Sequence, residues 1–135
     1  MVAFTSNTTG KFIYLCGTRD VPVAEAEPVF YEAESLIREF FPGAQVWNPA
    51  RQVLTYQSPG SLRDYLHLSL PFLVDASDLL VRLPGWSTSI VARAEHTLAV
   101  ALDIDVVSLR WKNNNGAKWY RIMELAPPSW DERDA

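Results

Sequence analysis

The pattern of apolar and polar positions along the chain predicts alternating strands and helices. Short apolar runs with aromatic and β-branched members read as strands buried on both faces, and they lie at 11–17, 44–47, 77–83 and 104–109. Apolar residues recur at helical spacing between these runs, at 29–41, from about residue 61, and at 89–102. Because strands that alternate with helices form right-handed crossovers, we expect an α/β fold with a small doubly wound, Rossmann- or flavodoxin-like parallel sheet of four to five strands.

Proline and glycine set the expected ends of the helices. Pro28 suits the first turn of the first helix, Pro42 and Gly43 stop it, and Pro71 should kink or end the second helix. The charged residues of the first helix are expected outside its apolar stripe, namely Glu25, Glu27, Glu32, Glu34, Arg38 and Glu39. The apolar face of the third helix is predicted to include Val91, Leu98 and Leu102.

The length of the chain fits one compact domain. Of its 135 residues, 48% are apolar and 21% are charged, which is enough to build a core without disulfides or a metal. We expect a polar lead-in at 1–10, the domain at 11–126 and a surface tail at 127–135. A short extra strand or helix is expected near 119–122.

Charge and cysteine content narrow the classes of function. The net charge is −4 and no run of Lys or Arg occurs, so a duplex nucleic acid is not expected as a partner. The first ten residues lack the features of a signal peptide, and no apolar stretch approaches a membrane span. The single cysteine, Cys16, lies in an apolar run and is expected to be a buried thiol. The sequence therefore predicts a cytoplasmic protein, with no metal and no cofactor.

Ligands of open α/β sheets bind beyond the carboxyl ends of the strands, so the candidate binding loops are 17–21, 48–60 and 84–89. The first loop offers Gly17, Thr18 and Arg19, which combine close backbone approach, a hydroxyl and a guanidinium suited to a phosphate or carboxylate. It lacks the spacing of a P-loop or a dinucleotide fingerprint. A plain turn with a solvent-exposed arginine is the alternative interpretation.

The loop before the third helix carries hydroxyl groups to a helix N-terminus. Gly85 and Trp86 are followed by Ser87, Thr88 and Ser89. Unpaired backbone N–H groups and the helix dipole favour an anion there, whereas N-capping requires one hydroxyl only.

Glu95 is the strongest candidate for a catalytic residue. It shares a helix face with Val91 and Leu98, so its carboxylate must be buried or face a cleft. A buried carboxylate is costly unless it is paired or reserved for a substrate. An ion pair with Arg82 or Arg93 is the alternative, and His96 is expected to face solvent or a neighbouring helix.

Several short motifs, in order, resemble the nucleoside 2-deoxyribosyltransferase superfamily. They are YLCGT at 14–18, NPA at 48–50, LPGW at 83–86, and Ser89 six residues before EH at 95–96. The nearest branch is a phage-associated domain of unknown function, and the 2′-deoxynucleoside 5′-monophosphate N-glycosidases are related. The resemblance covers most of 12–107.

The resemblance implies a nucleotide site lined by Tyr14, Ser89 and Glu95. Glu95 would attack C1′ of the sugar and form a glycosyl-enzyme intermediate, while Tyr14 would orient it. Thr18, Arg19 and Ser89 would contact the 5′-phosphate or 5′-hydroxyl. The further substrate-binding residues that we predict are Gly17, Asn48, Ser69, Gly85, Trp86 and Ser87.

The second helix departs from the superfamily. Relatives place an Asp there that protonates or holds the leaving base, and the matching position here is Ser69. A serine hydroxyl is no substitute for a carboxylic acid as proton donor. His67 or Asp64 would replace it if the helix were rotated, and Asp75 lies just after the helix.

The leading hypothesis is hydrolysis or transfer at the N-glycosidic bond of a nucleoside or its 5′-monophosphate. The rival is a nucleotide-binding or interaction module that kept the fold and lost the acid. A third class is a structural adaptor whose interface uses Trp47, Trp86, Trp111 and Trp119. The resemblance also implies a homo-oligomer, since relatives often complete their sites across subunits.

Overall fold

The computed structural model describes residues 11–17, 23–51, 61–112 and 122–126. The predicted lead-in, the tail and the position of Trp119 lie outside these residues. The elements in chain order are β1 (Phe12–Cys16), α2 (Val23–Phe40), β2 (Gln45–Trp47), α3 (Ser61–Pro71), the π-helical turn η2 (Phe72–Ala76), β3 (Leu79–Arg82), the 3₁₀ turn η3 (Trp86–Thr88), α4 (Ile90–Ala101), β4 (Asp105–Lys112) and β5 (Ile122–Ala126).

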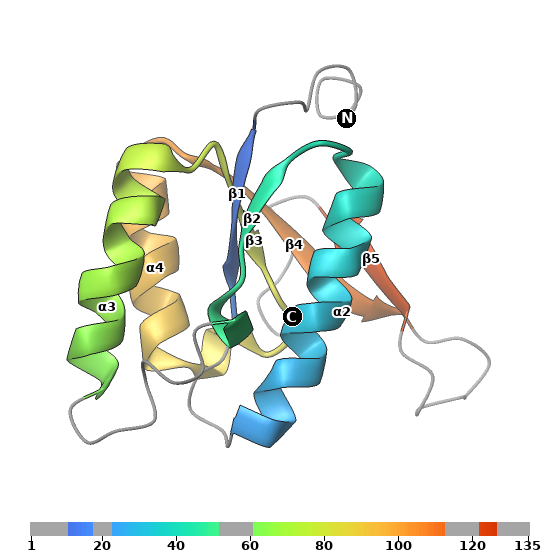
Figure 1. Cartoon of the computed structure of the whole chain (residues 1–135), viewed down its shortest axis with the longest axis horizontal. Helices are drawn as coiled ribbons and strands as arrows, with labels where there is room; N and C mark the ends of the chain where they lie inside the picture. Colours follow the sequence, from blue (N-terminus) through green and yellow to red (C-terminus); the bar gives the residue numbers. More distant parts are fainter. Residues whose placement is uncertain (1–10, 18–22, 52–60, 113–121, 127–135) are drawn as a thin grey trace.

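The strands form one sheet in the order β2-β1-β3-β4-β5 (Figure 1). The first four strands are parallel, and β5 adds to β4 in the antiparallel direction. The predicted α/β class with a small Rossmann-like parallel sheet is confirmed. Chain order reverses between β1 and β3, so their carboxyl ends flank the position where such folds bind ligands.

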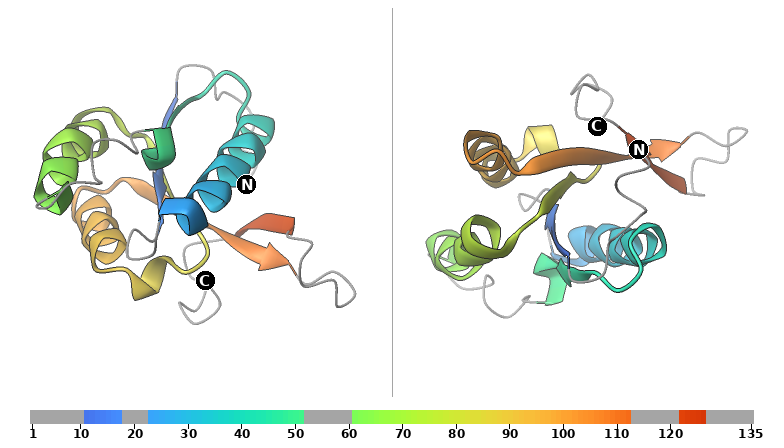
Figure 2. Two further views of the ribbon diagram at one scale, coloured as in Figure 1. Left: turned by 60° about the horizontal axis from the view of Figure 1, so that its bottom comes forward. Right: turned by 90° about the horizontal axis from the view of Figure 1, so that it is seen from above.

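The helices cover the two faces of the sheet unequally. α2 packs on one face, whereas α3 and α4 lie side by side on the other (Figures 1 and 2). Alternation along β1 sends Ile13 and Leu15 into the core under α2, and Tyr14 and Cys16 into the core under α3 and α4. Strand β1 thus contributes a tyrosine and a thiol to one face.

Local chemistry explains where the helices begin and end. Gly43 follows α2 with φ of 86°, a left-handed conformation that suits glycine, as the predicted stop requires. Ser89 caps α4, because its Oγ accepts a hydrogen bond from the N–H of Ala92 at 3.2 Å. Pro71 ends α3, and the chain continues as a π-helical turn.

Two expectations about the helices were wrong. Helix α2 starts at Val23, ahead of the apolar stripe, so Pro28 lies in its second turn and removes one helical hydrogen bond. Leu102 is 44% exposed because it follows the last turn of α4. Glu34 is buried because Asn48 and Arg51 of the segment after β2 bond its carboxylate.

Candidate functional site

Side chains from three elements meet at the carboxylate of Glu95. Glu95 lies on α4 and is 2% exposed. Its Oε2 accepts a short hydrogen bond from the hydroxyl of Tyr14 on β1 and a longer one, at 3.4 Å, from the hydroxyl of Tyr65 on α3. The predicted convergence of Tyr14 and Glu95 is therefore present, and Tyr65 is an addition that the sequence did not indicate.

The aromatic residues around Tyr65 fix its hydroxyl. The indole Nε1 of Trp47, at the end of β2, donates to the Tyr65 oxygen at 3.5 Å. Trp47 is stacked between Tyr14, at 6.3 Å between ring centroids, and Phe72 of η2, at 4.6 Å. The Tyr14 ring is thus held by stacking, and the Tyr65 hydroxyl is held by the indole N–H.

Burial and the charge of Glu95 both act on the ionisable groups around the carboxylate. Burial, then the Glu95 charge and Tyr65, raise the pKa of Tyr14 far above its usual value, so Tyr14 keeps its proton. Burial and then the Glu95 charge likewise raise the pKa of the Cys16 thiol. Cys16 is fully buried, as expected, and its Sγ donates to the backbone oxygen of Ala92 at 3.2 Å.

Ser69 faces the same cluster from α3. It is fully buried, one helical turn after Tyr65, and lies close enough to Tyr14 to oppose slightly the rise in the pKa of that phenol. Within the described part of the chain its Oγ has no hydrogen-bond partner. Burying a hydroxyl without a hydrogen bond lowers the stability of the folded protein, and a hydrogen bond to a polar ligand atom would offset that loss.

The two basic groups that were the alternative partners of Glu95 differ in burial. Arg82, buried at the end of β3, donates from Nε to Ser108 Oγ at 2.7 Å, and its guanidinium lies 4.7 Å from the Trp86 ring centroid. The exposed side of α4 carries Arg93. His96 packs its ring 4.7 Å from Trp86 rather than facing solvent alone.

The residues of the predicted binding loops have mainly structural contacts. A Cβ at Gly17 would lie 3.0 Å from Phe30 Cζ, so helix α2 requires glycine there. Gly85 adopts φ of 85° ahead of η3, and Trp86 is 1% exposed in the core. The Ser89 hydroxyl is used as the cap of α4. Ser87 is half-buried at the loop surface, while Thr18 and Arg19 lie outside the described residues.

Asn48 belongs to a second polar cluster, on the α2 face. Its Nδ2 donates to Glu34 Oε1 at 2.8 Å, and its Oδ1 accepts from the Ala50 N–H at 2.9 Å. Arg51 and Arg38 also bond the Glu34 carboxylate, each at 2.9 Å to Oε2. Burial alone would raise the pKa of Glu34, but the hydrogen bonds from Arg51, Asn48 and Arg38 outweigh it and lower the pKa to about 2.

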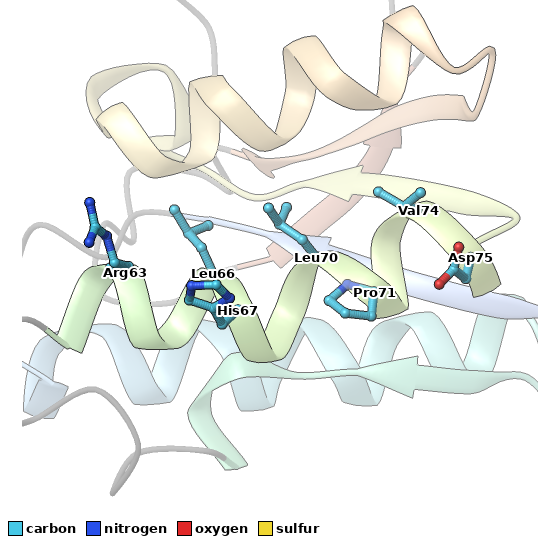
Figure 3. Close-up of a pocket in the computed structure, with 7 residues that line it drawn as sticks. All are labelled: Arg63, Leu66, His67, Leu70, Pro71, Val74 and Asp75. Atoms are coloured by element: carbon cyan, nitrogen blue, oxygen red, sulfur yellow. The ribbon is translucent and has the colours of Figure 1, made fainter.

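The proposed substitutes for the missing acid lie away from Glu95. His67 and Asp75 are exposed and line a groove of about 790 Å³ on the outer side of α3 (Figure 3). The side chain of Asp64 is outside the described set. Tyr65 is instead the residue of α3 that reaches the carboxylate. Its spacing of four from Ser69, which puts both on one helix face, was the available signal in the sequence.

Two of the tryptophans considered for an interface are packed inside the molecule. Trp47 is 7% exposed and Trp86 is 1% exposed. The side chain of Trp111 is outside the described set, as is Trp119. The two that can be located therefore stabilise the core beside α3 and α4.

The arrangement defines a class of site: a buried carboxylate held by two phenols at the reversal point of a Rossmann-like sheet. The chain belongs to the family described as a domain of unknown function, DUF4406, whose model matches residues 11–108. That span contains β1, all the helices and the whole Glu95 cluster. None of the curated proteins compared with the chain matches it.

The described residues contain neither a candidate membrane span nor a candidate metal site. No helix among them is long and apolar enough to cross a membrane. In the same part of the chain, no three His, Cys, Asp or Glu side chains gather as metal ligands.

Proposed function

We propose that the protein cleaves the N-glycosidic bond of a nucleoside or its 5′-monophosphate, with Glu95 as nucleophile. The observation that carries this proposal is the shared acceptor: Tyr14 and Tyr65 both donate to Oε2 of Glu95. Oε2 is thus the oxygen that both phenols hold, and Oε1 is the oxygen that we propose as the nucleophile. Fixing one carboxylate oxygen orients the second for attack on a sugar carbon.

The reaction follows the retaining pattern of glycoside hydrolysis. Oε1 bonds to C1′ as the bond from C1′ to the base nitrogen breaks, and the base takes a proton. Water then attacks C1′ of the glycosyl ester, which frees the sugar and restores the carboxylate. If an acceptor base attacks C1′ in place of water, the sugar is transferred to that base. The buried Ser69 hydroxyl lies near Tyr14 and makes no hydrogen bond of good geometry within the described part of the chain, which supports binding of a polar substrate there.

Access requires movement, because Glu95 and Tyr65 are only 2% and 1% exposed. The longer bond, at 3.4 Å from Tyr65, is the weaker of the two at the carboxylate. We infer that a substrate enters on the α3 side and breaks the bond from Tyr65 to Glu95, while Tyr65 keeps its bond from Trp47 and Tyr14 stays fixed in the sheet. A buried thiol at Cys16 suits the reducing cytoplasm in which we place the reaction.

The test is release of free base from a panel of nucleosides and their 5′-monophosphates, ribo and deoxy. We expect turnover of at least one substrate and a loss on the order of 10³-fold in Glu95→Gln, which keeps the shape and removes the nucleophile. Glu34→Gln is the matched control on the other face and should retain activity.

No base release from any substrate by the wild-type protein contradicts the proposal. If nucleotides then still raise the Tm, the site is a binding module without catalysis, since a ligand of the folded state alone increases stability. That second function is favoured by one observation, namely the serine at position 69.

A further inference from the structure

The leaving base needs a proton, and the structure shows where it can come from. Ser69 is fully buried near Tyr14, but an alcohol is too weak an acid for this step. One turn earlier on the same helix, Tyr65 places a phenol 3.4 Å from Glu95 Oε2. A phenol, with a usual pKa of about 10, is a far stronger acid than a serine hydroxyl.

We propose that Tyr65 is the proton donor to the leaving base in the N-glycosidic reaction. The inference rests on the function proposed above. It assigns the missing acid to a residue on the same helix face, four positions before the serine that replaces the expected carboxylic acid.

The two tyrosines are not equivalent in this role. Both phenols are buried and bond Glu95, so their positions distinguish them. Tyr14 lies on a central strand, has the short bond to the carboxylate, and has its pKa raised by burial and then by Glu95, so it holds its proton. Tyr65 lies on the covering helix, has the longer bond to the carboxylate, and accepts an N–H bond from Trp47 Nε1 at 3.5 Å. A donor aimed at the phenol oxygen stabilises the phenolate that forms when the proton leaves.

The step balances without a further reactant. As Glu95 Oε1 bonds to C1′, the bond to the base nitrogen breaks, and its electron pair takes the proton from the Tyr65 hydroxyl. The phenolate, held by the Trp47 N–H, then removes a proton from the water that attacks C1′. Glu95 leaves as a carboxylate and Tyr65 is neutral again, so one residue serves as acid and then base.

The experiment compares two leaving groups in the wild-type protein and in Tyr65→Phe. One substrate is an ordinary purine deoxynucleotide that the wild type cleaves, and the other is its N7-methylated form, whose cationic base departs without needing a proton. We expect Tyr65→Phe to lower kcat for the ordinary substrate by about 10²-fold or more and for the methylated one by less than about threefold.

Two matched variants separate acid catalysis from other effects. Tyr14→Phe, which loses the group that orients Glu95, should slow both substrates equally. Tyr31→Phe removes the same hydroxyl from an exposed position and should slow neither. Trp47→Phe keeps Tyr65 but removes the N–H donor to its oxygen, so it should slow cleavage of the ordinary substrate only. This variant tests the role of Tyr65 even if Tyr65→Phe does not fold.

Equal slowing of both substrates in Tyr65→Phe, or no slowing of either, overturns the role of Tyr65 and leaves the proposed function standing. Wild-type protein that cleaves only the methylated substrate also overturns it, because such an enzyme has no working acid. Wild-type protein that releases base from neither removes the proposed function and this inference together.

Discussion

Each face of the sheet buries a carboxylate, and the two carboxylates differ in the kind of hydrogen-bond donor that they have. Glu34, under α2, is 4% exposed and is bonded by the guanidinium groups of Arg38 and Arg51. Glu95, under α4, is 2% exposed and is bonded by the phenols of Tyr14 and Tyr65. One carboxylate is neutralised by cations, and the other is held by neutral donors.

This difference supports the proposal that Glu34 is a structural group and Glu95 a reactive one. Charged partners bond Glu34 and fasten the segment after β2 to α2, so its charge is used in folding. The two phenols are uncharged donors, so they orient Glu95 without supplying a counter-charge of their own. Burial alone does not mark a candidate catalytic carboxylate, and the character of its donors adds to the argument.

The largest expected effect on stability comes from Glu34→Ala. It removes the acceptor of Asn48, Arg38 and Arg51 together, and the buried Asn48 amide loses its short bond. We expect a loss of about 2 kcal/mol in the free energy of unfolding, below the value for a fully buried pair because both arginines are half-exposed. Urea denaturation measures it.

Glu95→Gln is the matched comparison for that experiment. Its amide oxygen can still accept from both phenols, so the free energy of unfolding should change by less than about 1 kcal/mol. An equal loss in both variants would mean that the two carboxylates contribute alike to folding and that the contrast drawn above is wrong.

The acid stability of the protein should depend on Glu34 in a defined window. Because its pKa falls from 4.5 to about 2 on folding, the ionised form stabilises the native state. That stabilisation is complete above pH 5 and is lost as the pH drops towards 2, with a size of somewhat under 2 kcal/mol after solvent screening. The gap in stability between wild type and Glu34→Ala should therefore close between pH 5 and pH 2. A difference in the free energy of unfolding that is unchanged at pH 2 would contradict the assignment of this pH dependence to Glu34.

A smaller effect should follow from removing the Ser69 hydroxyl. Because Ser69 Oγ has no partner within the described residues, Ser69→Ala should leave the protein as stable or raise the free energy of unfolding by up to about 1 kcal/mol. Asn48→Ala, on the other face, should destabilise. Thermal unfolding compares them, and a clear loss of stability in Ser69→Ala would show that its hydroxyl is already bonded.

The sequence predicted the helices and strands better than it predicted the side-chain contacts between them. Apolar runs located the four parallel strands, and the helix pattern identified Glu95 as a carboxylate on a buried face. The environment of Glu34 could not be predicted, because a polar position on α2 becomes buried only when Asn48 and Arg51 arrive from the segment after β2. Tyr65 was missed for the same reason, since its contact with Glu95 spans thirty positions of the chain.

The stacked rings of Phe12, Phe72, Trp47 and Tyr14 run from the surface of the molecule to the carboxylate. Trp47 lies inside this stack and donates to Tyr65, so its indole senses both the packing and the hydrogen bonding of the site. The protein therefore contains its own optical probe. The fluorescence of Trp47 can be isolated by subtracting the spectrum of Trp47→Phe. We expect its emission to shift when a nucleotide breaks the bond from Tyr65 to Glu95, so that binding is detected before any product forms.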